Sequence, residues 1–390
     1  MLEFQSLSKT FGPTHVAFFL TTATCLSLYI NTRLTLQNVS QAEKCISANT
    51  RHVAATGDSP YPLDVMPGGR TVESEYGTIQ VFEWGPQDGQ KVLLIHGVST
   101  PCLALRDMAR EFEALGCRVM LFDLFGRGFS DAPRDIPYDD RLYTTQILLA
   151  LASSPLAWTG DDAFHLVGYS LGGAIAAGFV AYRPNIARSL TLVCPGGLIR
   201  PHHVSLKSRF LYSRGILPSC LMNAIVRYRL KPHQGKTSAD IPVADDLDLD
   251  VPFDNVKLLP NVKVGDVVTW QLRHNQGFPQ AYRSTMGNSP IYGQHSKGWT
   301  RLAQHLKDRQ GGARMPGLTN GRVCLILAKN DPIVIAQEWI EDCKALFGER
   351  GVRYHVLDGG HDIGISRGKL VANTAIKTWS EPFQLDNGLD

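Results

Sequence analysis

The chain has 390 residues, of which 44% are hydrophobic and 19% are charged. This composition is typical of a globular protein and excludes a disordered chain. Its 39 lysines and arginines exceed its 36 aspartates and glutamates by three, and the basic residues are spread along the chain instead of forming a stripe. The sequence therefore predicts no nucleic-acid partner.

The N-terminal residues 15–30 form an uncharged and mostly apolar run between Lys9 and Arg33. The run is short for a membrane-spanning helix, which needs about 20 apolar residues, and no small-residue cleavage site follows it. We expect an uncleaved anchor that makes the protein membrane-associated, at the endoplasmic reticulum for example. A cleaved signal peptide on a secreted protein and a soluble leader on a cytoplasmic protein are the alternatives. Residues 31–68 are polar and irregular, which indicates a linker.

Beyond residue 68, short apolar runs alternate with helical patterns. Two runs of alternating apolar and polar residues, 71–76 and 78–84, flank Gly77 and predict a β-hairpin with a tight turn. Apolar runs typical of strands buried on both faces of a parallel sheet cover 91–96 and 118–123, and further strands are expected at 163–169, 189–194, 322–328 and 353–358. Helical patterns cover 102–115, 140–153, 171–182, 334–347 and 366–379. This alternation predicts an α/β fold with a mostly parallel, doubly wound sheet.

One long segment, between Pro195 and Gly317, interrupts this alternation. At roughly 120 residues it is too long for a loop, so we expect an inserted helical cap domain. Its aromatic residues would either line a substrate cavity or form the cap's own core. The expected domains are an N-terminal segment and linker at 1–68, a core at 69–197 and 315–390, and a cap at 198–314.

The sequence GYSLG at 168–172 places Ser170 between a predicted strand and a predicted helix. A side chain held on such a sharp turn has a strained backbone, and a Cβ two residues away on either side would collide with the strand or the helix. Gly168 and Gly172 meet this need. The pattern therefore indicates a nucleophile at Ser170 rather than a small residue in an ordinary turn.

Four motifs follow predicted strands, at the ends where open α/β sheets place their sites. They are IHG at 95–97, DLFGRGFSD at 123–131, GYSLG at 168–172, and NDP at 330–332 with GGHD at 359–362. In this order they resemble the motifs of the α/β-hydrolase fold family, over about residues 70–380. A looser resemblance points to the family's capped branch, which includes meta-cleavage product hydrolases and related esterases. The resemblance implies an α/β-hydrolase fold with an inserted helical cap.

The family's triad runs in the order nucleophile, acid and histidine, and Ser170, Asp331 and His361 fit that order. The resemblance implies that His361 is the base for Ser170 and that Asp331 orients His361. Asp358 and Asp362 lie closer to His361 along the chain, but neighbouring side chains on a tight loop point apart. Asp331 is therefore the expected acid.

The resemblance also implies an oxyanion hole made of the backbone N–H groups of Val98 and Leu171. Asp331 would in addition cap the predicted helix at 334–347. The residues expected to support the site are His96, Gly97, Gly168 and Gly172. The residues of DLFGRGFSD expected to have structural roles are Asp123, Gly126, Arg127 and Ser130.

Serine at the nucleophile position narrows the reactions that the resemblance implies, because epoxide hydrolases and haloalkane dehalogenases of the family use aspartate there. We expect a carboxylesterase- or thioesterase-like serine hydrolase that cleaves an ester, thioester, lactone or related acyl bond of a medium-sized apolar substrate through an acyl-serine. The alternatives are a C–C hydrolase, lyase or acyltransferase tailoring a secondary metabolite with the same triad, or a slow-turnover ligand-binding protein.

The sequence gives no sign of a cofactor. Dinucleotide, phosphate and metal motifs are absent from it, and none of its eight cysteines lies in a C-x-x-C spacing. Cys194 and Cys324 fall in apolar strand-like runs, where a thiol behaves as a small hydrophobic group. We therefore expect reduced cysteines, no metal and no cofactor.

Overall fold

A computed structural model of the full chain describes residues 22, 24–29, 45–203, 219–231, 253–312 and 316–381. Contacts divide the chain into two units, residues 1–44 and residues 45–390. Within the described residues, no helix has both the length and the apolar character needed to cross a membrane. The expected anchor at 15–30 lies mostly outside the described residues.

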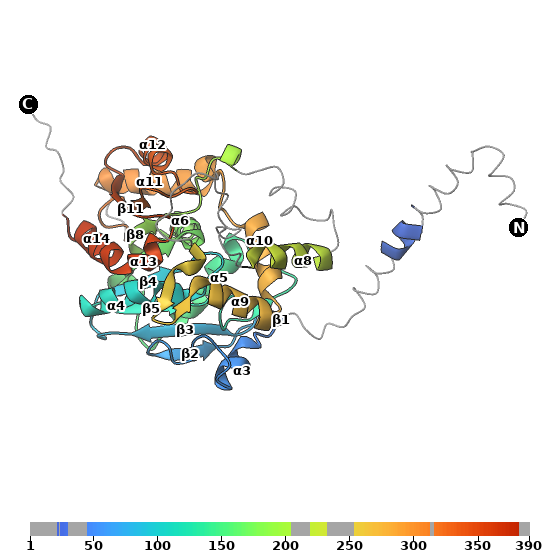
Figure 1. The fold of residues 1–390 in the computed structure, drawn as a ribbon. Coiled ribbons are helices and arrows are strands. Elements are labelled where there is room, and N and C mark those ends of the chain that lie inside the picture. The colour runs from blue at the N-terminus through green and yellow to red at the C-terminus, as the bar shows by residue number, and fades with distance from the viewer. Residues whose placement is uncertain are drawn as a thin grey trace, which may run out of the picture. The chain divides into compact units, whose positions relative to one another are not determined.

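An eight-stranded sheet forms the centre of the second unit (Figure 1). Its strands, in spatial order, are β12 (Val352–Leu357), β11 (Val323–Ala328), β8 (Ala187–Val193), β7 (Phe164–Tyr169), β4 (Lys91–Ile95), β5 (Arg118–Phe122), β3 (Ile79–Trp84) and β2 (Gly69–Val72). The pairs from β12 to β5 are parallel, and β3 pairs antiparallel with both β5 and β2. The predicted α/β fold with a mostly parallel sheet is confirmed.

The initial hairpin differs from the prediction in its register. Val72 of β2 pairs with Ile79 of β3, so β2 ends before the expected strand does, and residues 73–78 form the connection. Within that connection Gly77 has a φ of 102°, and its N–H donates to the carbonyl of Ser74 at 3.0 Å. The alternation of residue types extends into this turn, which is why the sequence predicts too long a strand.

Two groups of helices pack against the sheet. In the first group α4 (Arg106–Ala114) packs against α14 (Gly368–Ser380), with the short α13 (Ile363–Ser366) beside them. The second group consists of α5 (Asp140–Ala152), α6 (Leu171–Tyr182), α11 (Gly298–Gln310) and α12 (Ala336–Phe347). The inner strands between these groups, β11, β8, β7, β4, β5 and β3, are almost wholly buried, as their apolar sequences require. The edge strand β12 differs, because Tyr354 and Val356 are exposed on it.

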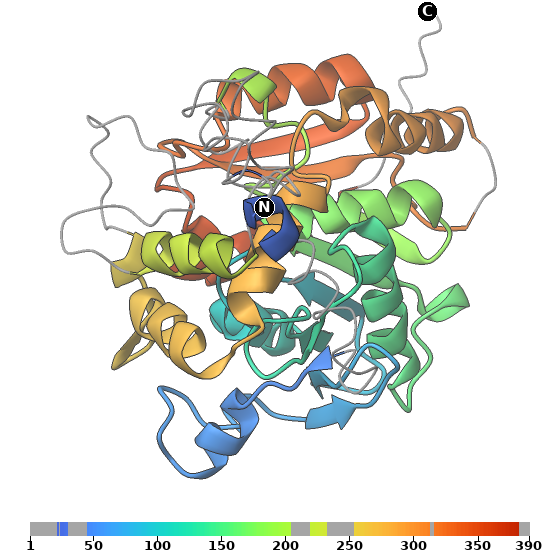
Figure 2. The same cartoon turned by 90° about the vertical axis from the view of Figure 1, so that its right-hand side faces the viewer.

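The described part of the insertion holds three helices that pack on one another: α8 (Ser219–Leu230), α9 (Val264–His274) and α10 (Phe278–Asn288) (Figures 1 and 2). We call these three the cap helices. A short hairpin of β9 (Lys257–Leu259) and β10 (Val262–Lys263) precedes α9. The aromatic residues Trp270, Phe278 and Tyr282 of α9 and α10 are buried.

Helix α11 lies within the expected cap boundaries but packs on the core, against α6 and α12. Trp299, Leu302 and Leu306 recur at helical spacing and form its buried face. The Trp299 ring stacks on Phe347 of α12, with centroids 5.9 Å apart. The expected cap is therefore too long at its C-terminal side.

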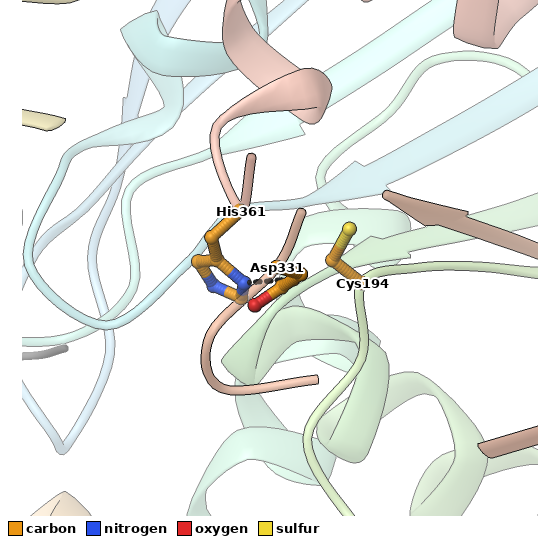
Figure 3. Close-up of side chains that lie close together, drawn as sticks. All are labelled: Cys194, Asp331 and His361. Atoms are coloured by element: carbon orange, nitrogen blue, oxygen red, sulfur yellow. Dashed lines mark hydrogen bonds and ion pairs between the residues drawn. The ribbon is translucent and has the colours of Figure 1, made fainter. Parts of the chain in front are cut away.

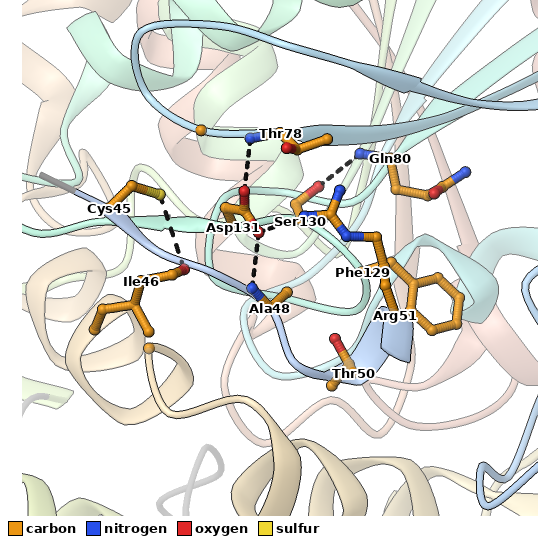
Figure 4. A network of polar contacts seen from close by, with 12 residues as sticks. Cys45, Ile46, Ala48, Thr50, Arg51, Thr78, Gln80, Phe129, Ser130 and Asp131 are labelled. Atoms are coloured by element: carbon orange, nitrogen blue, oxygen red, sulfur yellow. Dashed lines mark hydrogen bonds and ion pairs between the residues drawn. The ribbon is translucent and has the colours of Figure 1, made fainter. Parts of the chain in front are cut away.

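The expected linker also differs from the structure, because residues 45–68 belong to the second unit. Strand β1 (Cys45–Ile46) pairs with β6 (Ala132–Pro133), and α3 (Thr50–Ala55) follows it. Asp131 holds this segment: its Oδ1 accepts from the Ala48 N–H at 2.7 Å and from Arg51 Nη2 at 2.6 Å, as Figure 4 shows. Tyr61 adds an apolar contact, with its ring centroid 4.9 Å from that of Phe129. Because hydrogen bonds and a few isolated apolar side chains make this attachment, no regular hydrophobic periodicity could have predicted it.

Candidate active site

Ser170 lies on the turn between β7 and α6 with φ at 54° and ψ at −119°. A residue with a Cβ in this left-handed region carries about 1–3 kcal/mol of strain, which the surrounding contacts must offset. The two glycines of GYSLG allow the close approach. A Cβ on Gly168 would lie 2.3 Å from the Gly172 carbonyl oxygen, and a Cβ on Gly172 would lie 2.1 Å from that of Ile95.

A chain of hydrogen bonds joins Ser170, His361 and Asp331. His361 Nε2 lies 2.9 Å from Ser170 Oγ, and His361 Nδ1 lies 2.7 Å from Asp331 Oδ2. Because an ionised carboxylate only accepts hydrogen bonds, Nδ1 carries the proton and Nε2 is free to accept one from the serine hydroxyl. The Asp331 side chain is fully buried and that of His361 is 8% exposed. The geometry fits a hydroxyl activated by an oriented imidazole.

The second oxygen of Asp331 fixes the carboxylate from the other side. Oδ1 accepts the N–H groups of Ile333 at 2.8 Å and Val334 at 2.9 Å. The expected helix-capping role is wrong, since α12 begins at Ala336 with Ile335 as its N-cap. The carboxylate instead closes the turn just after β11, where Pro332 delays the start of the helix.

Of the three candidate acids, Asp331 is the one whose carboxylate lies 2.7 Å from His361 Nδ1. Asp358 is largely exposed and lies 3.9 Å from Lys329 Nζ. Asp362 precedes α13, and its side chain makes no capping hydrogen bond there. Asp331 is thus the carboxylate that the fold brings to His361.

Cys194 is a neighbour of the site that the sequence did not identify. It directly follows β8 and has φ at 39°, and its sulfur lies within 4.8 Å of the ligand-type atoms of Asp331 and His361 (Figure 3). Burial, together with the charge of Asp331, raises the pKa of the Cys194 thiol. The three donor types suit zinc, but metal binding would have to displace the 2.7 Å bond between Asp331 and His361 and ionise a thiol that burial keeps neutral. The arrangement therefore favours an uncharged thiol packed beside the carboxylate.

His96 fixes the turn that contains Gly97 and Val98. Its Nε2 accepts the Leu124 N–H at 2.9 Å, so Nδ1 bears the proton and donates to the Gly97 carbonyl at 2.8 Å. Burial lowers the pKa of His96 to about 3, which keeps the ring neutral. The Gly97 carbonyl belongs to the same peptide as the Val98 N–H, so this bond also sets the direction of that N–H.

The turn lies beside Ser170, since a Cβ built on Gly97 would be 3.5 Å from Ser170 Cβ. Leu171 begins α6, whose first N–H groups have no acceptor within the helix. In the part of the chain that the structure describes, no hydrogen-bond acceptor is found for the Val98 or the Leu171 N–H. Two backbone donors beside a nucleophile are what an oxyanion hole requires.

Tyr169 is a second neighbour that sequence reasoning missed. Its hydroxyl donates to the His361 carbonyl at 3.0 Å, and its ring fills the space left by the absent side chain of Gly364. The only signal in the sequence was the place of Tyr169 inside GYSLG. Tyr169 therefore ties the histidine loop to the strand that carries Ser170.

A family model described as alpha/beta hydrolase fold matches residues 90–367, which is more than half of the chain. The chain therefore belongs to the α/β-hydrolase fold family. Lipase 1 of Psychrobacter immobilis is 23% identical over 230 residues, a match that covers 53% of this chain and 67% of that lipase. Monoglyceride lipase of Homo sapiens is 29% identical over 120 residues, covering 30% of this chain and 39% of that lipase.

Solved structures share the fold at lower identity. Naproxen esterase (carboxylesterase NP) of Bacillus subtilis aligns with a TM-score of 0.53 and 13% identity, covering 85% of this chain and 96% of that structure. The thioesterase domain from the curacin biosynthetic pathway aligns with a TM-score of 0.50 and 18% identity, covering 79% of this chain and 98% of that structure. The chain spans about two thirds of the bacterial lipase and about two fifths of the human one.

Proposed function

We propose that the protein is a serine hydrolase that cleaves an ester or related acyl bond of a medium-sized apolar substrate. The observation that carries the proposal is the hydrogen-bonded chain from Asp331 through His361 to Ser170, with two backbone donors beside it. The lipases and esterases among the similar proteins support ester cleavage and an apolar substrate.

In this proposal Ser170 Oγ attacks the acyl carbon while its proton passes to His361 Nε2. Asp331 stabilises the resulting imidazolium, and the N–H groups of Val98 and Leu171 bind the oxyanion. His361 then gives the proton to the leaving group, which departs and leaves the acyl group on Ser170. Water attacks the acyl-serine as His361 takes its proton, and the acid product leaves with the serine hydroxyl restored.

The test is hydrolysis of p-nitrophenyl esters from acetate to laurate, with thioesters and lactones beside them, by the full chain. We expect turnover of at least one ester and a loss of about 10³-fold or more in Ser170→Ala, because the residual rate relies on binding and the oxyanion hole alone. Ser366→Ala, which removes an exposed serine, is the matched control. A folded protein that turns over none of these substrates, or an equally active Ser170→Ala, would refute the proposal.

The same substrates separate hydrolysis from transfer and lyase chemistry. In water enriched in oxygen-18, hydrolysis places the label in the carboxylic acid product. An acyltransferase or lyase forms products without that label. The proposal requires the labelled acid.

A further inference from the structure

Two fully buried side chains connect the cap helices to the turn at residues 97–99. Gln271 of α9 donates from Nε2 to the Ser99 carbonyl at 2.9 Å, and its Oε1 accepts the Gly128 N–H at 2.8 Å. Arg127 donates from Nε to the Val98 carbonyl at 3.0 Å and from Nη2 to Thr285 Oγ1 of α10 at 2.9 Å. Both bridges run between the cap helices and the turn that carries the Val98 N–H.

The turn is therefore held at three successive carbonyls, each by one side chain. His96 donates to Gly97, Arg127 to Val98 and Gln271 to Ser99. The peptide that carries the Val98 N–H accepts the first of these bonds at its own Gly97 carbonyl, and the next peptide accepts the second at the Val98 carbonyl, so the orientation of the N–H depends on both. Only His96 belongs to the sheet core, while Gln271 belongs to the cap and Arg127 reaches into it.

Thr285 is in turn fixed within the cap. Its hydroxyl donates to the Ala281 carbonyl at 2.7 Å and lies 2.7 Å from the Tyr143 hydroxyl, so it accepts from Arg127 with little freedom to rotate. Packing at this place is tight as well: a Cβ on Gly126 would lie 2.3 Å from Ala281 Cβ. A shift of α10 would thus be transmitted to Arg127 and from there to Val98.

The charge of Arg127 makes this link unusual. The guanidinium is fully buried, and within the described residues its hydrogen bonds go to neutral oxygens of Val98, Phe125, Tyr143 and Thr285 rather than to a carboxylate. An unpaired buried cation is costly, and neutral residues of similar size would fill the same space at lower cost. Its position next to the turn gives a reason for its presence, since a positive charge there favours the negative oxygen that develops on the substrate.

We propose that the cap helices are part of the catalytic machinery: Gln271 and Arg127 are positioning residues that aim the Val98 N–H, so that the cap sets the oxyanion hole as well as access to it. This inference rests on the proposed hydrolase function. If the cap helices aim the Val98 N–H, the rate of acyl transfer depends on contacts between the cap and the turn, even for a substrate too small to reach a pocket lined by the cap. If the cap only controlled access to the site, loss of these contacts would change KM and leave kcat unchanged.

The experiment compares full-length variants on p-nitrophenyl acetate. Gln271→Leu and Thr285→Val keep the shape of the side chain and remove the bonds that lead to the turn. We expect each to lower kcat about 10- to 100-fold with KM within about threefold, since misplacing a catalytic group by an ångström costs about 100-fold. Binding of a trifluoromethyl ketone, whose adduct needs the oxyanion hole, should weaken by the same factor.

Ser289→Ala is the matched control, because Ser289 Oγ donates to the Tyr138 carbonyl at 2.8 Å and joins the cap to the core without touching the turn. It should keep kcat within about twofold, with a change in unfolding temperature like that of Thr285→Val. The inference is overturned if Thr285→Val and Gln271→Leu keep wild-type kcat, if they change only KM, or if Ser289→Ala loses as much kcat. If Gln271→Leu does not fold, Thr285→Val decides alone. A wild-type chain that hydrolyses no ester refutes the proposed function, and the inference with it.

Discussion

Asp331 binds two backbone N–H groups with one oxygen and the imidazole of His361 with the other, and this division explains how one carboxylate orients an imidazole. Oδ1 is occupied by the Ile333 and Val334 N–H groups, so Oδ2 is already aimed when it accepts the proton of His361 Nδ1. The imidazole then has one tautomer and one orientation. The turn at the end of β11 thus holds His361 in the orientation that the proposed mechanism requires of its base.

We predict that Asp331→Asn lowers kcat by about 10⁴-fold, because the amide can bind the tautomer of His361 that has no free Nε2 lone pair for the serine proton. The fold should persist, since the amide oxygen can still accept the two backbone N–H groups. Steady-state kinetics on a p-nitrophenyl ester measures the effect. Asp358→Asn is the control, and a kcat within tenfold of wild type in Asp331→Asn would contradict the role given to this carboxylate.

At the residue scale, the sequence predicts those site residues that lie in a short motif of recognisable residue types and spacing. Ser170, Asp331 and His361 each lie in a short motif after a strand, and the fold brings them together. Cys194 and Gln271 carry no such motif. Their positions depend on the packing of elements distant in sequence, so single-residue patterns could not assign them to the site.

Strand β7 carries a buried titratable group in its contact with α14. His165 stacks on Trp379 with ring centroids 4.0 Å apart, and its Nδ1 lies 2.7 Å from Ser189 Oγ. Burial lowers the pKa of His165 to about 3 from an ordinary value of 6.5. Between these two pH values the unfolded chain binds a proton that the folded chain does not.

We predict that the free energy of unfolding falls as the pH is lowered from 6.5 toward 4, by about 1.4 kcal/mol per pH unit for each histidine buried in neutral form. His165→Phe keeps the stacking and removes the titration, so its slope should be shallower by about that amount. Urea unfolding at several pH values measures the slope. An unchanged slope in His165→Phe would contradict the burial of a neutral ring.

The segment formed by β1 and α3 depends on Asp131 for its attachment. Besides Ala48 and Arg51, the carboxylate accepts the Thr78 N–H at 2.9 Å, so it also joins the segment to the start of β3 (Figure 4). We predict that Asp131→Ala lowers the free energy of unfolding by about 2–4 kcal/mol, because buried N–H groups lose their acceptor. Asp135→Ala, at an exposed position nearby, should change it by less than about 0.5 kcal/mol. Equal stabilities of the two variants would contradict this account.

At the element scale, the inner parallel strands could be predicted because burial on both faces demands apolar runs. The edge strand β12 is partly exposed and has the mixed sequence VRYHVL, so its prediction rested on its place in the alternation of strands and helices. The structure differs from the prediction at three places, where contacts other than burial of a continuous apolar run determine the position of an element. The hairpin register is set by pairing of Val72 with Ile79, the β1–α3 segment by hydrogen bonds to Asp131, and α11 by burial of Trp299 against core helices. None of these contacts has a local signature in sequence.

The division into two units leads to a prediction for the whole molecule. The hydrogen bonds from Asp331 through His361 to Ser170 lie in residues 45–390, and so does the sheet. We predict that a chain lacking residues 1–44 keeps its kcat/KM for a soluble ester within about twofold and keeps its unfolding temperature. A chain lacking residues 1–51 should unfold at a lower temperature, because it loses Ala48, Thr50 and Arg51. Equal unfolding temperatures would show that the β1–α3 segment is not part of the folded unit.

Reaction of the intact chain with a fluorophosphonate tests the central claim most directly, since such a reagent reports an activated serine hydroxyl whatever the natural substrate. Mass spectrometry of the digested protein should find one adduct, on the peptide that contains Ser170, and none in Ser170→Ala. His361→Ala should react at least about 10²-fold more slowly, because the serine loses its base. A folded protein that forms no adduct, or an adduct on another serine, would contradict the account.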